Sequence, residues 1–277
     1  MKPCKPDQLG FYQTIHGHPE AQHQEAPMSD AAERAIERLR YFEPPEGYYL
    51  AFSGGKDSIV IHRLAELAGV RFDAHHSLTT IDPPELVHFI RQQYPQVQID
   101  RPNTPLLRRL SVKGFPLRQR RWCCEEYKER GGTDRVVVTG IRKAESNNRS
   151  KRQVFEHCMK GGYKSKNKRF MNPIIDWTDG EVWSFIRGQD MPYCELYDQG
   201  WKRIGCLFCP MQYYKRRYRE AERYPRYKRL FIKAFEQLHA TGRDSMKRWA
   251  TGEDMFWWWL GSGKQEVQAP TLFMEDV

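Results

Sequence analysis

The stretch Ser-Gly-Gly-Lys-Asp-Ser at residues 53–58 has the composition of a loop that binds phosphate. An apolar run at residues 48–52 precedes it, and a pattern typical of an amphipathic helix follows it. Glycines let the backbone approach an anion closely, and the free N–H groups and dipole of a helix N-terminus favour negative charge. We therefore expect the loop to bind nucleotide phosphates through Ser53, Gly54, Gly55, Lys56, Asp57 and Ser58.

This loop is not a Walker A motif, which requires glycine where Leu50 stands and Ser or Thr where Asp57 stands. An ordinary glycine-rich turn is the alternative, but the strand before the loop and the helix after it favour phosphate binding. Asp57 is a candidate for orienting Mg²⁺. It could equally be a helix-start carboxylate that the dipole stabilises.

The cysteines suggest a second chemistry. The chain has seven, and the odd number, an adjacent pair and a CxxC motif argue against a secreted disulfide framework. Thiolates bind zinc or iron–sulfur clusters, and adjacent cysteines suit a zinc tetrahedron poorly. The alternative is that they are buried thiols that pack as small hydrophobic groups. The candidate metal ligands are Cys123, Cys124, Cys206 and Cys209, whereas Cys4, Cys158 and Cys194 stand alone.

Cations crowd the segment after Gly140. Arginine binds phosphate in bidentate geometry, so Arg142 and Arg149 are candidates for anion contacts. On composition alone, a solvated charged loop is the simpler interpretation.

The elements that must position these residues alternate between strand and helix. Apolar strands are expected near residues 48–52, 70–77, 97–99 and 135–139, with helices between them. Gly69 predicts a helix stop, and Thr178 with Glu181 predicts a capping box before another helix. Residues 140–169 are interpreted as a long loop. The pattern predicts an α/β fold with a mostly parallel twisted sheet, helices on both its faces and a helical C-terminal extension.

The expected organisation has three parts: a flexible lead-in at 1–27, a nucleotide-binding domain with an iron–sulfur site at 28–210, and a helical extension at 211–277. In the extension, residues 213–229 interleave tyrosines with cations. They form either an amphipathic surface helix, which we favour, or a nucleic-acid contact. FWWWL (256–260) is expected to pack on the body or on a partner.

Charge and hydropathy limit the partners and the location. The net charge of +10 and a pI near 9.2 favour a polyanion or a phosphorylated partner. No apolar run reaches the roughly 18 to 20 residues of a membrane span, and the start shows no secretory signal. We therefore expect no membrane partner and a cytoplasmic location.

Together these motifs resemble the phosphoadenosine phosphosulfate reductase family of the PP-loop ATP pyrophosphatase superfamily. The resemblance rests on SGGKDS, on CC…CxxC and on the segments TTIDPPELVHFI (79–90), VVTGIRKAESNNRSKR (137–152), NPIIDWTDGEVWSFI (172–186) and PYCELYDQGWKRIGCLFC (192–209). It implies an adenine nucleotide alpha hydrolase-like fold that binds ATP and Mg²⁺, and a 4Fe-4S cluster on the four cysteines. It also implies nucleotide contacts by the loop and Gly140, and catalytic roles for Lys56, Asp57, Arg142 and Arg149.

Reductases of this family carry a nucleophilic cysteine near the C-terminus, but no cysteine follows Cys209 here. The chain is closest in character to the ATP-pyrophosphatase component of DNA phosphorothioation systems. We therefore expect cleavage of ATP between its α and β phosphates in support of sulfur incorporation into nucleic acid, with a sulfur-donor protein such as a cysteine desulfurase as partner. The alternatives are a sulfonucleotide reductase and a non-catalytic nucleotide-sensing subunit.

Overall fold

A sheet of six strands in the order β3-β2-β1-β4-β6-β5 organises the molecule. The computed structural model describes residues 28–158 and 167–261. Every neighbouring pair of strands is parallel except β5 and β6, which are antiparallel. The predicted mostly parallel sheet is thus confirmed. The strands are β1 (Tyr48–Ala51), β2 (Phe72–Ser77), β3 (Gln98–Asp100), β4 (Val136–Val138), β5 (Phe155–His157) and β6 (Arg169–Met171).

Helices connect and flank these strands. Gly69 ends α2 in the left-handed conformation with φ of 67°, and Thr178 and Glu181 form the predicted capping box of α7. The α-helices are α1 (Asp30–Tyr41), α2 (Lys56–Ala68), α3 (Pro84–Gln93), α4 (Leu106–Lys113), α5 (Trp122–Tyr127), α6 (Asn147–Ser150), α7 (Asp179–Gly188), α8 (Tyr214–Arg223), α9 (Pro225–His239) and α10 (Gly252–Leu260), and short 3-10 helices are η1 (Lys143–Glu145), η3 (Glu195–Tyr197) and η4 (Asp244–Met246).

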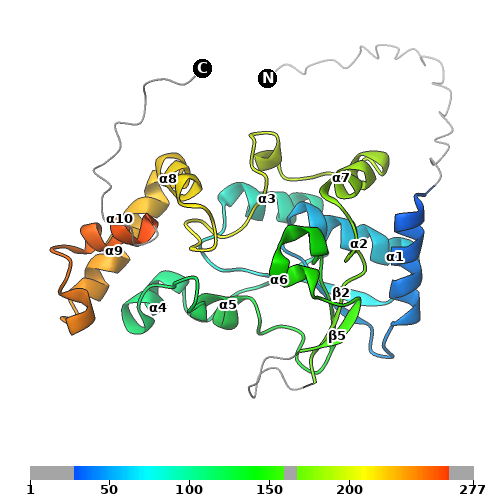
Figure 1. Ribbon diagram of the computed structural model, residues 1–277, viewed down its shortest axis with the longest axis horizontal. Coiled ribbons are helices and arrows are strands. Elements are labelled where there is room, and N and C mark those ends of the chain that lie inside the picture. Colours follow the sequence, from blue (N-terminus) through cyan, green and yellow to red (C-terminus); the bar gives the residue numbers. More distant parts are fainter. Residues whose placement is uncertain (1–27, 159–166, 262–277) are drawn as a thin grey trace, which may run out of the picture.

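The first hydrophobic core lies between the sheet and helices α1, α2, α3 and α7 (Figure 1). From the sheet, Tyr48, Leu50 and Val138 point into this core, and all three are fully buried. Tyr49 and Val137 belong to the opposite face because successive side chains of a strand alternate. There Gly131 and Gly132 approach closely, and a Cβ at Gly131 would lie 1.9 Å from the Tyr49 hydroxyl oxygen.

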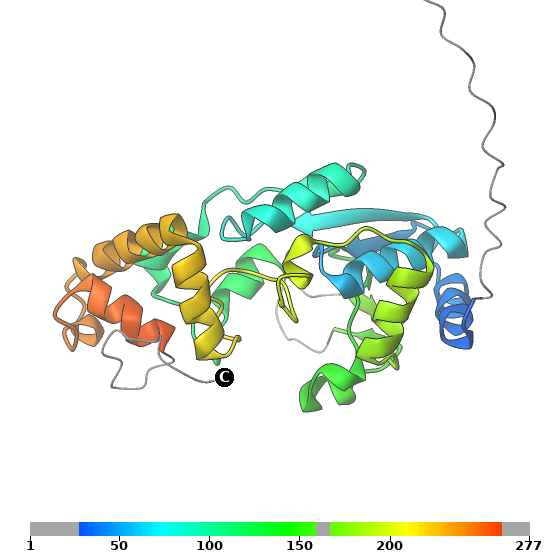
Figure 2. The same ribbon diagram turned by 90° about the horizontal axis from the view of Figure 1, so that it is seen from above.

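A second hydrophobic core joins α4 and α5 to the C-terminal helices α8, α9 and α10. Both views place this helical group at the other end of the molecule from α1 (Figures 1 and 2). The predicted helical extension is therefore present. The division at residue 210 stays a prediction, and the second core includes Trp122 and Leu207 on one side of it and Phe231 and Phe256 on the other.

The long loop expected at residues 140–169 is only partly correct. Ser146 caps the short helix α6, and β5 pairs with β6, so that Phe155 lies opposite Met171. Local polarity concealed these elements because a four-residue helix and a three-residue edge strand leave little hydrophobic periodicity. Residues 159–166 of this segment lie outside the described residues, as do the lead-in at 1–27 and residues 262–277.

Candidate functional site

The phosphate loop, residues 53–58, joins the end of β1 to the start of α2. Gly54 has a φ of +75°, and a Cβ there would lie 2.7 Å from the Cδ1 atoms of Leu86 and Ile90 on α3. Only glycine accommodates both the left-handed backbone and this close approach. Gly55 is the N-cap of α2, so the first N–H groups of this helix, which have no preceding helical turn to bond to, lie in the loop. This backbone is suited to an anion.

Hydroxyl groups hold the loop in place. Ser58 Oγ donates to the carbonyl of Gly55 at 2.8 Å, and the N–H of Gly55 donates to Ser53 Oγ at 3.3 Å. The N–H of Lys56, the first residue of α2, donates to the hydroxyl oxygen of Tyr197 at 2.8 Å. Tyr197 comes from η3, far away in the sequence, and the sequence analysis did not single it out.

Two buried cations and two carboxylates form a charge network beside the loop. Lys56 Nζ lies 3.1 Å from Asp57 Oδ2 and 2.9 Å from Asp179 Oδ1. The Arg142 guanidinium donates to Asp57 Oδ1 through Nε at 2.7 Å and to Asp179 Oδ1 through Nη2 at 2.9 Å. Lys56 is only 6% exposed and Arg142 only 3%. Buried charges need partners of opposite sign, and each cation here has two.

Asp179 is a functional candidate that the sequence analysis missed. It is the first residue of α7, next to the predicted cap, and no local pattern distinguishes it from an ordinary helix-start carboxylate. Burial raises the pKa of Asp179, but a hydrogen bond and the charge of Lys56, together with Arg142, bring it below its usual value. Burial lowers the pKa of Arg142, but the charge and hydrogen bond of Asp57, together with the charges of Glu145 and Asp179, raise it above its ordinary value. Asp179 and Arg142 are therefore both held in their charged forms.

The structure separates the two predicted arginines. A Cβ at Gly140 would lie 2.9 Å from the Cβ of Asp57, so a glycine brings the segment after β4 against the phosphate loop. Arg142 follows directly into the charge network. Arg149 instead forms an ion pair with Glu145, whose carboxylate also accepts the backbone N–H of Arg142 at 3.1 Å. Arg149 thus supports, through Glu145, the segment that carries Arg142.

Cys206 contacts residues that follow β2, the strand that pairs with β1 and thus neighbours the phosphate loop. Its Sγ is 3.4 Å from Thr79 Oγ1 and 4.0 Å from Asp82 Oδ1, and the N–H of Leu207 donates to the carbonyl of Ile81 at 2.8 Å. Residues 79–82 follow β2, which pairs with β1 in parallel. Parallel strands end at the same edge of a sheet, so the thiol and the phosphate loop lie at the same edge.

The two cysteine pairs act on one another electrostatically. A hydrogen bond with Cys124, burial and the charges of Cys206 and Cys209 all raise the pKa of Cys123. The hydrogen bond with Cys123 is also the main reason that the pKa of Cys124 is lowered to about 6, and Lys128 contributes. The negative charge of Cys206 in turn raises the pKa of Lys128. One thiolate beside a lysine is thus stabilised, and the thiolate is the form of cysteine that binds metals.

The remaining described cysteines stand apart from these pairs. Cys194 is fully buried in the first core, where burial raises its pKa, and Cys158 follows β5. Across residues 28–158 and 167–261, no three His, Cys, Asp or Glu side chains are arranged to hold a single metal ion.

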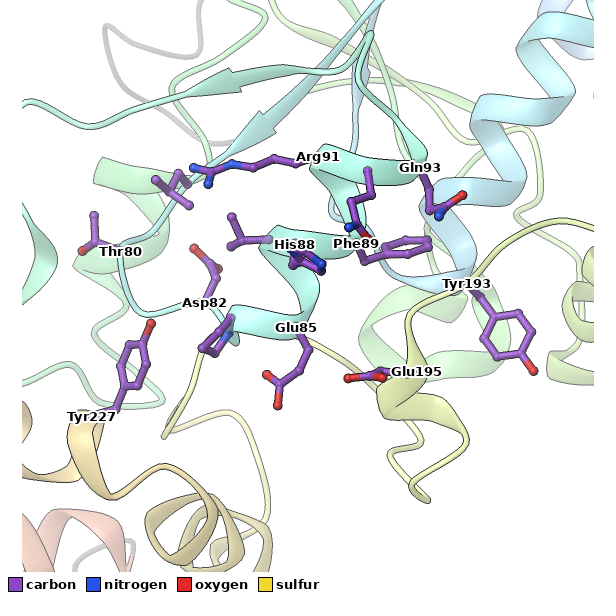
Figure 3. Close-up of a pocket in the computed structure, with 14 residues that line it drawn as sticks. Thr80, Asp82, Glu85, His88, Phe89, Arg91, Gln93, Tyr193, Glu195 and Tyr227 are labelled. Atoms are coloured by element: carbon purple, nitrogen blue, oxygen red, sulfur yellow. The ribbon is translucent and has the colours of Figure 1, made fainter. Parts of the chain in front are cut away.

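An open pocket of about 920 Å³ follows α3 (Figure 3). Thr80 and Asp82 line one part of it and Tyr193 another, and Glu85 and His88 of α3 lie between them. The described residues that line it include neither residues 53–58 nor the four paired cysteines. The pocket therefore adjoins the cysteine segment through Asp82 but is not the phosphate site.

The tyrosine- and arginine-rich segment forms α8 and the start of α9. Arg217 and Glu220 are fully buried, and Arg217 donates to the carbonyl of Trp259 at 2.8 Å. Lys215 and Arg219 are exposed on the other side of α8. This is the amphipathic surface helix that the sequence favoured, and it leaves cations exposed. The FWWWL run lies in α10, within the second core.

Comparison with known proteins agrees with this arrangement. The model of the phosphoadenosine phosphosulfate reductase domain matches residues 47–212. An uncharacterized protein of Methanocaldococcus jannaschii is 30% identical over 223 residues, which are 76% of this chain and 51% of that protein. An adenosine 5'-phosphosulfate reductase of Staphylococcus epidermidis is 28% identical over 211 residues, which are 67% of this chain and 80% of the reductase.

A solved phosphoadenylyl-sulfate (PAPS) reductase of Candida auris, in complex with phosphate, covers 63% of this chain and 89% of its own, at 21% identity and a TM-score of 0.48. The chain spans about half the length of the two relatives from M. jannaschii that it matches, 51% and 44%. In the described part of the chain, no helix has the length and apolar character needed to cross a bilayer.

Proposed function

This chain belongs to the phosphoadenosine phosphosulfate reductase domain family, and from that premise we propose that it is an ATP pyrophosphatase supporting sulfur incorporation into nucleic acid, most specifically DNA phosphorothioation. An oxygen of the substrate would attack the α-phosphorus of ATP. The bond between the α-phosphorus and the oxygen bridging to the β-phosphate would break, and pyrophosphate would leave. The adenylated oxygen then becomes a good leaving group, which sulfur can replace.

One observation carries this proposal: an anion-binding loop and a thiol site share the carboxyl edge of two neighbouring strands. The loop follows β1, and Cys206 rests on residues that follow β2. In open α/β sheets, ligands bind at this edge. Nucleotide activation and sulfur delivery could therefore take place side by side.

The residues of the charge network have separate roles in this proposal. Lys56 and Arg142 neutralise the negative charge that develops on the departing pyrophosphate, and Asp57 and Asp179 hold both cations in position. Preorganised charges of this kind stabilise a transition state more than mobile ones do because they need no reorganisation during the reaction. Gly54, Gly55 and the hydroxyls of Ser53 and Ser58 shape the loop that receives the phosphates.

Mg²⁺, which accompanies ATP phosphates, would neutralise their charge when bound. Asp57 and Asp179 offer the oxygen donors that it prefers. Both carboxylates already pair with Lys56 and Arg142, so in this arrangement they fit a role in orienting the cations better than direct coordination of a metal.

A 4Fe-4S cluster would be held by Cys123, Cys124, Cys206 and Cys209, and it would supply or relay sulfur. The donor type and number fit a cluster. In the described residues, no three His, Cys, Asp or Glu side chains are placed to hold a metal ion. The choice of a cluster over zinc rests on the sequence, because adjacent cysteines suit a zinc tetrahedron poorly.

A second candidate is reduction of a sulfated nucleotide, favoured by the relative from S. epidermidis whose name is adenosine 5'-phosphosulfate reductase. Residues 210–277 contain no cysteine that could form a covalent intermediate with sulfate. This observation favours ATP as the substrate.

Nucleic acid and a sulfur-donor protein such as a cysteine desulfurase are the proposed partners. The net charge of +10 and the exposed cations of α8, close in sequence to Cys209, suit a polyanion.

Two parallel assays on anaerobically purified protein test the function. In the first, pyrophosphate release from ATP is measured with and without DNA. In the second, sulfite release from adenosine phosphosulfate is measured. We expect release of pyrophosphate, stimulated by DNA, and no sulfite. Sulfite formation without pyrophosphate release would show that the reductase alternative is correct.

A further inference from the structure

Tyr197 occupies the position at the phosphate loop where an anion is expected. Its hydroxyl oxygen accepts the N–H of Lys56 at 2.8 Å, and a Cβ on Gly55 would lie 3.3 Å from the same oxygen. The first N–H groups of a helix have no partner within the helix, and phosphate oxygens ordinarily bind there. Here an oxygen of the chain itself is bound instead.

This contact is weaker than the one that a nucleotide would make. The Tyr197 ring packs edge-on against Trp183, with ring centroids 5.1 Å apart, and burial raises the pKa of its hydroxyl. The group at the N–H of Lys56 is therefore a neutral phenol. Hydrogen bonds to an ionised oxygen are roughly twice as strong as those to a neutral one. A phosphate next to Lys56 would consequently displace the phenol.

Tyr197 is also connected to the thiols. It ends η3, and the described residues 198–205, which contain no helix or strand, lead from it to Cys206. Beyond Cys206, the N–H of Leu207 is fixed to the carbonyl of Ile81. Cys194, which precedes η3, and Leu196 within η3 are fully buried and anchor the chain in the first core. Because residues 198–205 join Tyr197 directly to Cys206, a movement of the Tyr197 side chain would be transmitted along them toward Cys206.

We propose that the Tyr197 hydroxyl is a resident substitute for a nucleotide phosphate oxygen, and that a bound nucleotide displaces it and thereby repositions the segment that carries Cys206 and Cys209. This inference rests on the proposed function because it assumes that nucleotide binds at residues 53–58. It adds that occupancy of the phosphate loop controls the geometry of the thiol site. Sulfur chemistry would then proceed only after ATP has bound.

The test compares the full chain with Tyr197→Phe, which removes the hydroxyl and keeps the ring. Tyr193→Phe is the matched control, because Tyr193 packs on the same Trp183 ring but its hydroxyl donates to Asp198 at 3.0 Å. Calorimetry gives the affinity for ATP. Amide hydrogen exchange, resolved by mass spectrometry, follows residues 53–58 and 195–205 with and without ATP.

In the wild type, we expect ATP to protect residues 53–58 and to accelerate exchange at residues 195–205 by about three- to tenfold, the effect of losing one neutral hydrogen bond. Tyr197→Phe should show the faster exchange without ATP, no further change there with ATP, and about two- to tenfold tighter ATP binding. Tyr193→Phe should respond to ATP as the wild type does.

Two results would overturn the inference alone. One is protection of residues 53–58 by ATP with residues 195–205 unchanged in the wild type. The other is weaker ATP binding by Tyr197→Phe, which would make the hydroxyl a phosphate ligand. Absence of any protection at residues 53–58 would instead overturn the proposed nucleotide site together with this inference, so the two failures are distinguishable.

Discussion

The phosphate side and the thiol side of the site are built in different ways. At the phosphate loop, Lys56 and Arg142 are buried and each is paired with two carboxylates. At the thiol side, the four paired cysteines are half-buried, and the hydrogen bond between Cys123 and Cys124 raises the pKa of the first and lowers that of the second. At the phosphate loop, both buried cations have carboxylate partners within the chain. At the thiol side, the charges of the thiols act on one another.

This difference indicates what each side requires. The charged groups of a preorganised network need not move to receive a nucleotide, because their partners are already in position. Thiolates bind metals or clusters, so the thiol side is suited to take up such a group. The predictions that follow test this contrast, from the largest expected effect to the smallest.

Cys206→Ser should abolish the cluster. Loss of one thiolate ligand is expected to remove almost all iron and the brown absorption from anaerobically purified protein. Cys158→Ser, at a half-buried cysteine beyond β5, is the control and should keep both. Iron analysis and visible absorption spectra provide the measurement. Colourless wild-type protein with stoichiometric zinc would contradict the cluster assignment.

Arg142→Ala should slow pyrophosphate release from ATP by about 100- to 1,000-fold, the usual effect of removing one preorganised group that stabilises transition-state charge. Arg149→Ala is the matched control because Arg149 pairs with Glu145 outside the network. It should cost about tenfold at most, the loss that follows when a supporting contact is removed. Equal losses in both variants would mean that Arg149 also contacts the nucleotide.

Gly54→Ala should destabilise the fold by about 2 to 5 kcal/mol, because it combines backbone strain with overpacking against Leu86 and Ile90. Gly69→Ala has the same positive φ but nothing within 4 Å of the added Cβ, and it should cost only about 1 to 2 kcal/mol. Urea unfolding of both variants measures the difference. Equal costs would show that the contact with α3 leaves room for a side chain.

The stability contributed by the second core and that contributed by the phosphate side should also respond to pH in opposite directions. Burial raises the pKa of Glu220 in the second core above its ordinary 4.5, so the unfolded chain loses this proton first. Stability contributed by protonated Glu220 is therefore lost as the pH rises above 4.5 through its folded pKa. Asp179, whose pKa is lowered, contributes stability that is lost only as the pH falls below its ordinary 3.8.

Glu220→Gln should reduce the difference in stability between measurements at about pH 5 and about pH 7, because one such proton contributes a slope of at most about 1.4 kcal/mol per pH unit. Glutamine keeps an oxygen that can accept the N–H of Phe208, as Glu220 does in the structure. Urea unfolding at the two pH values measures the slope. An unchanged slope would assign the pH dependence to other groups.

Local sequence patterns predicted most of the sheet and the loop. The apolar runs predicted β1 to β4 but not β5 or β6, Gly69 marked the end of α2, and Thr178 with Glu181 marked the start of α7. These features depend on neighbours within a few residues, so they can be read from one sequence.

Contacts between distant segments were not accessible in the same way. Asp179 pairs with Lys56 and Arg142, and Tyr197 binds the N–H of Lys56, only because the fold brings four segments together. Arg149 shares its local composition with Arg142, and only the structure separates them. The second core likewise joins α4 and α5 to α8–α10 across a long stretch of sequence.

Analysis of the products of ATP is the most direct test of the central claim. Anaerobically purified wild-type protein, incubated with ATP, Mg²⁺ and DNA, should convert ATP to pyrophosphate and an adenylate product, and Arg142→Ala should do so far more slowly. Formation of ADP and phosphate, or ATP left intact while adenosine phosphosulfate is reduced to sulfite, would contradict the account.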